Sequence, residues 1–193
     1  MEKYFNIRYE FDKAVVQERI AQKAVNFGIV YGISAFGLSQ DLNISRKEAQ
    51  EYIDSYFETY PKVKEFLDKC VADAKENGYT RTLSGRIRPI PELASSNFMQ
   101  RQFGERVAMN APIQGTAADI IKIAMLRVHD RLYKEGYLSR LILQVHDELL
   151  IETKENEKEA VIALLEEEMS GAANLLVDLE VGTESGRTWY EAH

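Results

Sequence analysis

The chain has 193 residues, of which 45% are hydrophobic, enough for one large domain or two small ones with a buried core. It contains neither a run of about 18 apolar residues nor the apolar stretch of a signal peptide, so we expect a cytoplasmic protein without a membrane partner. Its single cysteine, Cys70, excludes an internal disulfide and a cysteine-based zinc site. The formal net charge of −7 excludes a uniformly basic coat for nucleic acid, although the excess acid is confined to residues 106–193.

The first part of the chain has the pattern of consecutive helices. A helix is predicted over about 14–32. Ser45 is placed as the N-cap of a second helix that runs to about Thr59, because Glu48 completes a capping box. A third helix is predicted over 61–77, with a proline in its first turn and Asn-Gly after its last residues.

The middle of the chain changes character. Residues 79–91 favour a short strand and a turn rather than a helix. An apolar-periodic segment follows from about 98 to 136. Pro112 and Gly115 disturb it, so that residues on either side of them are not expected to share one regular helix face.

The last part of the chain predicts a hairpin, a helix and a strand. Residues 141–153 are apolar on both sides of a polar centre, which is typical of a hairpin. A charged amphipathic helix is predicted over 155–171, and a final strand over 175–181. The whole pattern predicts an α+β fold.

One stripe of the first predicted helix changes from basic to aromatic. Arg19, Lys23, Phe27 and Tyr31 recur every fourth residue, and side chains at this interval lie along one side of a helix. The two cations suit phosphate oxygens, and the two aromatic rings suit a sugar and a base. A nucleoside triphosphate could therefore lie along the stripe. The alternative is a solvated basic face followed by core aromatics.

Two further groups of side chains suit a nucleic acid. Between positions 81 and 106 basic residues outnumber acidic ones, and this strip could hold a phosphate backbone even on an acidic protein. Its members are Arg81, Arg86, Arg88, Arg101 and Arg106. Arg106, Asn110 and Gln114 form a second set at intervals of four, with donors for phosphate, sugar or base edges. The alternatives are a solvated loop for the strip and capping of a disturbed helix for the second set.

The centre of the predicted hairpin carries Asp147 and Glu148. Carboxylates held on two strands offer the hard oxygen ligands that Mg²⁺ prefers, and Mg²⁺ commonly binds one or two protein carboxylates together with substrate phosphates. A pair of such ions can assist phosphoryl transfer, but a second ion usually needs a carboxylate from elsewhere. An acidic pair in a turn can also be ordinary solvated turn chemistry.

Three motifs of this chain, in this order, resemble those of family A DNA polymerases, the bacterial DNA polymerase I group. The first joins the basic and aromatic stripe to Gly28 and Gly32, and continues in Ala-Phe-Gly-Leu at 35–38. The second is 105–119, which contains Asn-Ala-Pro-Ile-Gln-Gly-Thr-Ala-Ala-Asp. The third is Gln-Val-His-Asp-Glu-Leu at 144–149.

The resemblance implies helical fingers over residues 1–104, followed by the C-terminal part of an antiparallel palm sheet with flanking helices over 105–193. It implies that Arg19 and Lys23 act on the triphosphate of a dNTP, that Phe27 packs on its sugar and base, and that Tyr31 guards the templating position.

The resemblance also assigns the remaining candidate residues. Asp147 would be a Mg²⁺ ligand, with Glu148 close by, and the residues expected to be catalytic are Asp147, Glu148, Lys23 and Arg19. Contacts with primer-template DNA are implied for His146 and for the sets described above. The residues expected to bind DNA are Arg81, Arg86, Arg106, Asn110, Gln114 and His146.

One motif of the family is missing from this sequence. The strand that supplies a second catalytic aspartate lies upstream of the fingers in the family, so we expect a two-ion Mg²⁺ site that is incomplete in this chain. We therefore expect a DNA-templated DNA polymerase in fragment form, inactive or severely impaired alone. A non-catalytic nucleotide- or DNA-binding module, or one subunit of a split polymerase that needs a complementing fragment, is the alternative.

Overall fold

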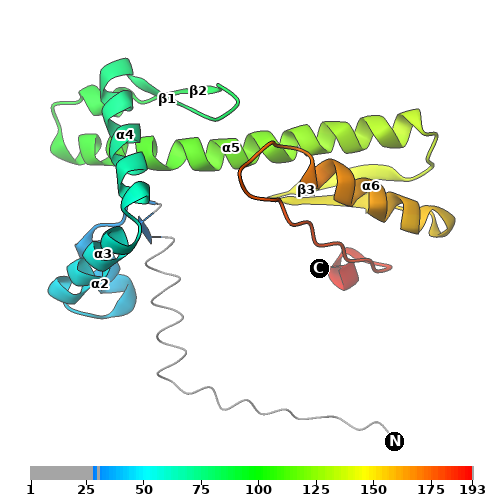
Figure 1. The fold of residues 1–193 in the computed structure, drawn as a ribbon, viewed down its shortest axis with the longest axis horizontal. Helices are drawn as coiled ribbons and strands as arrows, with labels where there is room; N and C mark the ends of the chain where they lie inside the picture. Colours follow the sequence, from blue (N-terminus) through cyan, green and yellow to red (C-terminus); the bar gives the residue numbers. More distant parts are fainter. Residues whose placement is uncertain (1–27, 30, 193) are drawn as a thin grey trace, which may run out of the picture. The chain divides into compact units, whose positions relative to one another are not determined.

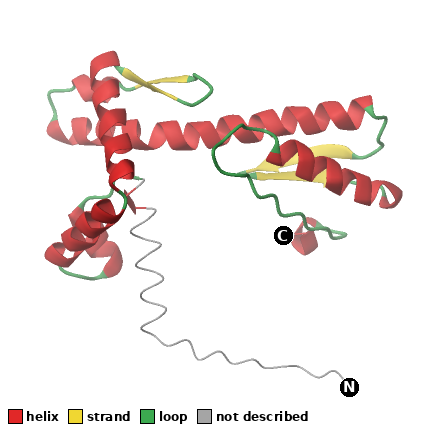
Figure 2. Ribbon diagram, in the orientation of Figure 1, coloured by secondary structure: helices red, strands yellow, loops and turns green. Residues whose placement is uncertain are grey.

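The computed structural model describes residues 28, 29 and 31–192, and helices predominate among them (Figures 1 and 2). Contacts divide the described chain into two compact units. The first contains the residues up to Thr80 together with Ile87–Pro112, and the second contains Arg81–Arg86 together with the residues from Ile113 onward. Two small antiparallel two-stranded sheets complete the fold, which agrees with the expected α+β class at this level.

Two helices of the first unit begin and end close to where the sequence predicts: α3 is Arg46–Thr59 and α4 is Pro61–Asn77. Helix α2, Ala35–Leu42, was not predicted, because the small residues around 32–37 indicated a turn. The capping box at the start of α3 is confirmed, because Ser45 Oγ accepts a hydrogen bond from the Glu48 amide at 3.2 Å and the Glu48 carboxylate accepts one from the Ser45 amide at 2.9 Å.

Two apolar clusters hold the first unit together. The first cluster consists of Ile29, Leu38, Ala49 and Leu67. It packs Ile29, which precedes α2, against one residue from each of α2, α3 and α4. The second cluster is centred on Ala74 of α4, Ile90 and Ala108. The sheet of β1 (Tyr79–Arg81) and β2 (Ile87–Pro89) and the short helix η1 (Pro91–Ala94) lie between α4 and the next helix in the chain.

Helix α5 has about the predicted length but is more regular than the sequence suggested. It runs without interruption over Phe98–Lys134, with Pro112 inside it. Proline removes one backbone hydrogen bond from a helix interior. The burial of Ala108, Ala111 and Ala124, each at most 7% exposed, shows why tertiary packing can offset that loss. The expectation that Pro112 separates two different helix faces was therefore wrong.

The second unit is built from the end of α5, a hairpin and α6. Strand β3 (Arg140–Val145) pairs with β4 (Glu148–Glu152), and the short helix η2 (Glu155–Glu157) leads into α6 (Lys158–Ser170). These elements confirm the predicted hairpin and amphipathic helix. Their core consists of Val128 and Leu132 of α5 and Val161 and Leu164 of α6, with Leu149 and Ile151 of β4 packed against it.

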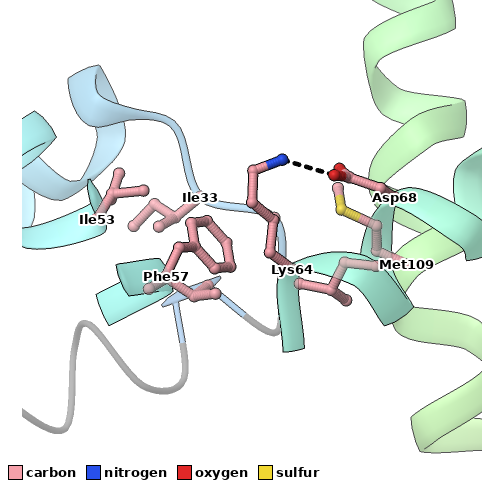
Figure 3. A pocket seen from close by; sticks show the side chains of 9 residues that line it. Ile33, Ile53, Phe57, Lys64, Asp68 and Met109 are labelled. Atoms are coloured by element: carbon pink, nitrogen blue, oxygen red, sulfur yellow. Dashed lines mark hydrogen bonds and ion pairs between the residues drawn. The ribbon is translucent and has the colours of Figure 1, made fainter. Parts of the chain in front are cut away.

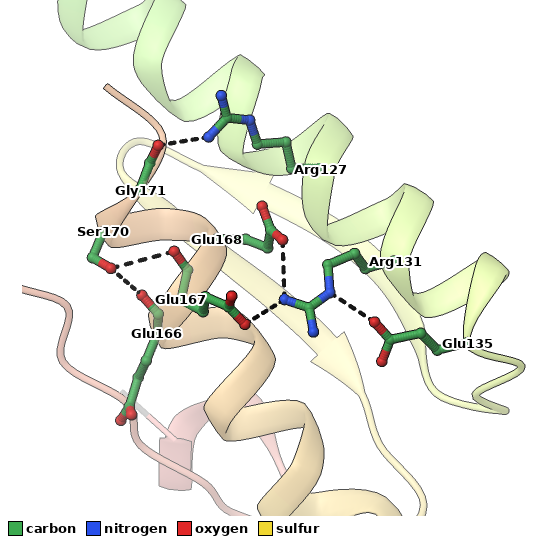
Figure 4. A network of polar contacts seen from close by, with 8 residues as sticks. All are labelled: Arg127, Arg131, Glu135, Glu166, Glu167, Glu168, Ser170 and Gly171. Atoms are coloured by element: carbon green, nitrogen blue, oxygen red, sulfur yellow. Dashed lines mark hydrogen bonds and ion pairs between the residues drawn. The ribbon is translucent and has the colours of Figure 1, made fainter. Parts of the chain in front are cut away.

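An ionic network ties α5 to α6 (Figure 4). The Arg131 guanidinium contacts Glu167 at 2.5 Å, Glu135 at 2.8 Å and Glu168 at 3.0 Å. These hydrogen bonds, with that to Glu167 the strongest, raise the pKa of Arg131 above its ordinary value. Arg127 donates to the Gly171 carbonyl at 2.6 Å, so two consecutive turns of α5 hold the end of α6.

The predicted strand at 175–181 was wrong. The residues in this range have no regular secondary structure, and Leu176 and Val177 are strongly exposed. A strand exists only through hydrogen bonds to a neighbouring strand. Within the described part of the chain the second sheet contains β3 and β4 alone, so the segment has no ladder to join. Among the described residues, none of the helices combines the length and the hydropathy that a membrane span requires.

Candidate active-site hairpin

The β3–β4 hairpin presents His146, Asp147 and Glu148 to solvent at its turn. Val145 pairs with Glu148, so that His146 and Asp147 are the two residues of a tight turn. All three polar side chains are exposed. Leu149 and Ile151 on the adjoining strand pack on the core of the second unit, which fixes the base of the hairpin.

The backbone of this turn is unusual at His146, where φ is 51°. A residue with a Cβ in the left-handed region is disfavoured by roughly 1–2 kcal/mol, and such positions cluster at functional sites. Gln144 supports the turn, since its side-chain amide donates to the His146 carbonyl at 2.6 Å. The hairpin therefore holds Asp147 next to a strained residue, although glycine would satisfy the backbone better.

The hairpin carries side chains of the type that Mg²⁺ prefers. Asp147 and Glu148 supply exposed oxygen donors of the right chemistry, and Mg²⁺ needs few protein ligands when substrate phosphates complete its shell. No group of three His, Cys, Asp or Glu side chains that could hold a metal occurs among the described residues. The described residues therefore form no closed metal site by themselves, and Asp147 remains a candidate ligand.

The predicted nucleotide stripe lies mainly outside the described residues. This applies to Arg19, Lys23 and Phe27, whereas Tyr31 is described. It is 46% exposed and lies in a turn after the helical residues Gly28 and Ile29.

The turn that contains Tyr31 needs a glycine at the next position, Gly32. Gly32 has φ 69°, and a Cβ there would approach Met109 Cε to 2.6 Å and Arg106 Cγ to 2.9 Å. The turn therefore packs directly on α5, at the helix turn that carries Arg106. Sequence reasoning noted the glycine without identifying its partner.

The predicted DNA-binding set on α5 lies on one continuous helix. Arg106 and Gln114 are exposed, and Asn110 is half-buried. Asn110 Oδ1 is buried and has no hydrogen-bond partner among the described residues. An orphaned buried acceptor of this kind requires an explanation, and a bound ligand that donates to it is one.

The arginines of the predicted strip are partly engaged within the chain. Arg86 Nε contacts Asp119 Oδ1 at 2.8 Å, and Arg86 Nη2 donates to the Gly115 carbonyl at 3.0 Å. Arg101 Nη1 donates to the Ser95 and Ser96 carbonyls at 2.9 and 2.8 Å. Arg81 is exposed on β1.

A pocket of about 190 Å³ lies in the first unit (Figure 3). Apolar side chains form most of its lining, including Ile33, Phe57 and Met109, and Lys64 pairs with Asp68 at its edge at 2.5 Å. Gly32 also borders it, so the pocket adjoins the turn that carries Tyr31.

Comparison with known proteins identifies the family. Residues 3–191 match the family model described as DNA polymerase family A. The chain belongs to DNA polymerase family A. It is 51% identical over 181 residues to DNA polymerase I of Bacillus caldotenax, and 53% identical over 173 residues to DNA polymerase I of Caldicellulosiruptor bescii. These matches cover 94% and 90% of the chain but only 21% and 20% of the relatives, so the chain spans about a fifth of their length.

A solved structure agrees with this assignment. The POL domain of Pol1 from M. smegmatis, in complex with DNA primer-template and dNTP, is similar with a TM-score of 0.89 and 45% sequence identity. The similarity covers 94% of this chain and 32% of the other. The mainly helical fold with its two small sheets is therefore that of the corresponding part of a DNA polymerase I domain.

Sequence reasoning missed one feature of this family A chain. Asp119 was seen only as the end of a motif, but it accepts hydrogen bonds or ionic contacts from Ser84 and Arg86. The signal available in the sequence was the spacing of Gly115 and Asp119, one helical turn apart. The partner residues, Ser84 and Arg86, lie more than 25 positions upstream, and no sequence pattern links them to Gly115 or Asp119.

Proposed function

We propose that this chain contributes the nucleotide-binding and part of the catalytic surface of a DNA-templated DNA polymerase, with fingers at 1–104 and the C-terminal part of the palm at 105–193. The main support is its match to DNA polymerase family A over residues 3–191. Its likeness to a POL domain that binds primer-template and dNTP points to the same substrates.

The proposed reaction joins a dNTP to the end of a primer. The primer 3′-hydroxyl attacks the α-phosphate, the bond to the β-phosphate oxygen breaks, and pyrophosphate leaves. Asp147 is the proposed ligand of Mg²⁺ on this chain, with Glu148 beside it. The ion, when bound, supplies positive charge to the phosphate oxygens and lowers the pKa of the attacking hydroxyl.

The residues proposed to hold the nucleotide are those of the stripe. Arg19 and Lys23 neutralise the triphosphate, Phe27 packs on the sugar and base, and Tyr31 guards the position of the templating base. The exposure of Tyr31 supports this role, because a ring in this position must be reachable by a base.

The residues proposed to hold the DNA are on α5 and the hairpin. Arg106, Asn110 and Gln114 contact the primer-template and the new base pair, and His146 lies near the primer end. The exposure of Arg106 and Gln114 supports this assignment, since side chains that contact DNA must be reachable from solvent.

Primer extension tests the proposal. We expect little extension by the chain alone, and restored extension when it is mixed with a chain that carries the upstream aspartate strand and the thumb of a family A polymerase. Asp147→Ala should abolish extension in that mixture, whereas Asp178→Ala, which removes another exposed carboxylate, should leave it near the parent level. An active Asp147→Ala mixture would refute the metal assignment.

The alternative functions predict different results in the same assays. A non-catalytic module would bind dNTP or primer-template but show no extension in any mixture. A subunit of a split polymerase would extend primers only with its natural partner chain. Retained binding without turnover under all conditions would therefore favour the module.

A further inference from the structure

The loop between β1 and β2 is fastened to one stretch of α5. The Leu83 amide donates to Thr116 Oγ1 at 3.0 Å, and Ser84 Oγ donates to Asp119 Oδ2. Arg86 adds the two contacts to Asp119 and to the Gly115 carbonyl. We call this arrangement, Thr82–Arg86 on Gly115–Asp119, the loop clip. All of its members belong to the second compact unit.

The loop is shaped before it meets the helix. The Thr82 amide donates to the Arg86 carbonyl and the Gly85 amide donates to the Thr82 carbonyl, both at 3.0 Å. Gly85 has φ 86°, which a residue with a side chain rarely adopts. A rigid loop of this kind can hold its helix partner in one place.

The glycine at position 115 lets the loop approach the helix closely. A Cβ at Gly115 would lie 2.6 Å from Thr82 Cγ2, so a larger residue there would force the Thr82 side chain to shift. The glycine weakens the helix by roughly 1 kcal/mol relative to alanine, and Pro112 one turn earlier removes a backbone hydrogen bond. The turn that carries Gln114 is therefore intrinsically weak and gains support from outside the helix.

The charged groups of the clip, Arg86 and Asp119, pair with each other. The Asp119 side chain is 14% exposed, and its pKa lies below the ordinary value because Ser84 donates to it, with Arg86 acting in the same direction. It is therefore ionised at neutral pH. Arg86 directs its planar fork at Asp119 and at the helix backbone, a geometry that lysine cannot reproduce.

We propose that Arg86 is a positioning residue, which holds the Gln114 turn of α5 in the conformation that meets primer-template DNA, and that it does not itself bind a phosphate. This inference rests on the proposed function. It replaces the sequence-based expectation of a direct Arg86 contact with DNA. Gln114 is exposed and directly precedes Gly115, whose carbonyl Arg86 holds.

The salt dependence of DNA binding separates positioning from phosphate contact. The affinity of the chain for a primer-template duplex is measured by fluorescence anisotropy over a range of KCl concentrations. We expect Arg86→Gln to weaken binding about 3- to 10-fold with an unchanged salt slope. A lost phosphate contact would instead reduce the slope by roughly 0.9. Arg187→Gln, which removes an exposed charge elsewhere, is the matched control.

Two further variants test the route through Gln114. Arg86→Lys should bind as weakly as Arg86→Gln, because the charge without the fork cannot hold both partners. In the Arg86→Gln background, Gln114→Ala should cause little additional loss, since residues that act as one unit are not additive. Purely structural damage elsewhere would give additive losses.

Hydrogen exchange shows whether the helix turn itself responds. In the free chain, Arg86→Gln and Asp119→Asn should both accelerate exchange of amides 113–119 while the melting temperature shows that the fold remains intact. The inference would be overturned by any of four results. These are normal DNA binding by Arg86→Lys, a reduced salt slope for Arg86→Gln, additive losses in the double variant with Gln114→Ala, and unchanged exchange of amides 113–119. A parent chain that binds no primer-template would overturn the proposed function as well, which distinguishes the two failures.

Discussion

His146 illustrates how a single residue can oppose the stability of its own turn. Its φ of 51° places a side chain where glycine is preferred, directly before the proposed metal ligand Asp147. A turn chosen only for stability would carry a residue such as asparagine or glycine. The strain is explained if the imidazole is needed at that point for the primer end.

A pair of substitutions at His146 tests this explanation. His146→Ala retains the strain and His146→Gly removes it, so we expect the glycine variant to be at least as stable as the alanine variant, by up to about 1 kcal/mol in urea unfolding. Both should lose activity equally in the complemented primer-extension assay. A fully active glycine variant would show that the side chain has no role there.

Glu157 gives a pH-dependent contribution to stability. Its carboxylate accepts hydrogen bonds from the amides of Leu138 and Ser139 and from Ser139 Oγ at 2.6 Å. These contacts, with that to the Leu138 amide the largest, lower the pKa of Glu157 below its ordinary value. Because the folded state favours the ionised form, the stabilisation is complete above the unfolded-state pKa and is lost as the pH falls through the lower folded-state pKa.

Chemical unfolding at several pH values checks this sign. Glu157→Gln should be less stable than the parent at pH 7, and the difference should shrink as the pH falls below about 4, because the parent carboxylate then protonates. Glu159→Gln, at a neighbouring exposed carboxylate, is the control and should show a smaller difference. A gap that persists unchanged at low pH would mean that charge is not its cause.

Among the elements, α3 begins where its local sequence, the capping box, predicts. Ser45 and Glu48 satisfy each other's backbone amides, as the capping box predicts. Ser45→Ala should cost about 1 kcal/mol of unfolding free energy, whereas Ser45→Asp, which retains an acceptor, should cost much less. Thermal or urea unfolding measures both, and equal losses would indicate that packing, not capping, sets the start of α3.

The wrongly predicted strand at 175–181 shows the limit of element patterns. Its apolar residues have strand propensity, but Leu176 and Val177 remain exposed in the described structure. Strand propensity describes fit to a pleated, half-buried surface and does not supply a partner. The β3–β4 hairpin was predicted correctly because its two strands are neighbours in sequence and supply each other's hydrogen bonds.

At the scale of the whole molecule, the two compact units have separate cores. The first is centred on Leu38, which is fully buried, and the second on Val128. Leu38→Ala should destabilise the first unit by about 2–5 kcal/mol. Hydrogen exchange should then accelerate in α2–α4 with less change in α6, and Val128→Ala should give the reverse pattern. Equal acceleration in both units after either change would show a single cooperative structure.

Sequence alone determined the features that depend on neighbouring residues. The limits of α3 and α4, the β3–β4 hairpin and the three polymerase motifs follow from patterns a few residues long, because caps, turns and periodicity act over that distance. The exposed position of Asp147 at a hairpin turn was also foreseen for this reason.

Only the tertiary structure decided the features that join distant residues. The continuity of α5 through Pro112 depends on packing, and the close approach of Gly32 to Met109 depends on a turn meeting a remote helix. The pairing of Arg86 with Asp119 likewise joins two parts of the chain whose separate patterns gave no sign of contact. Contacts of this kind are set by the three-dimensional path of the backbone, which short-range preferences do not specify.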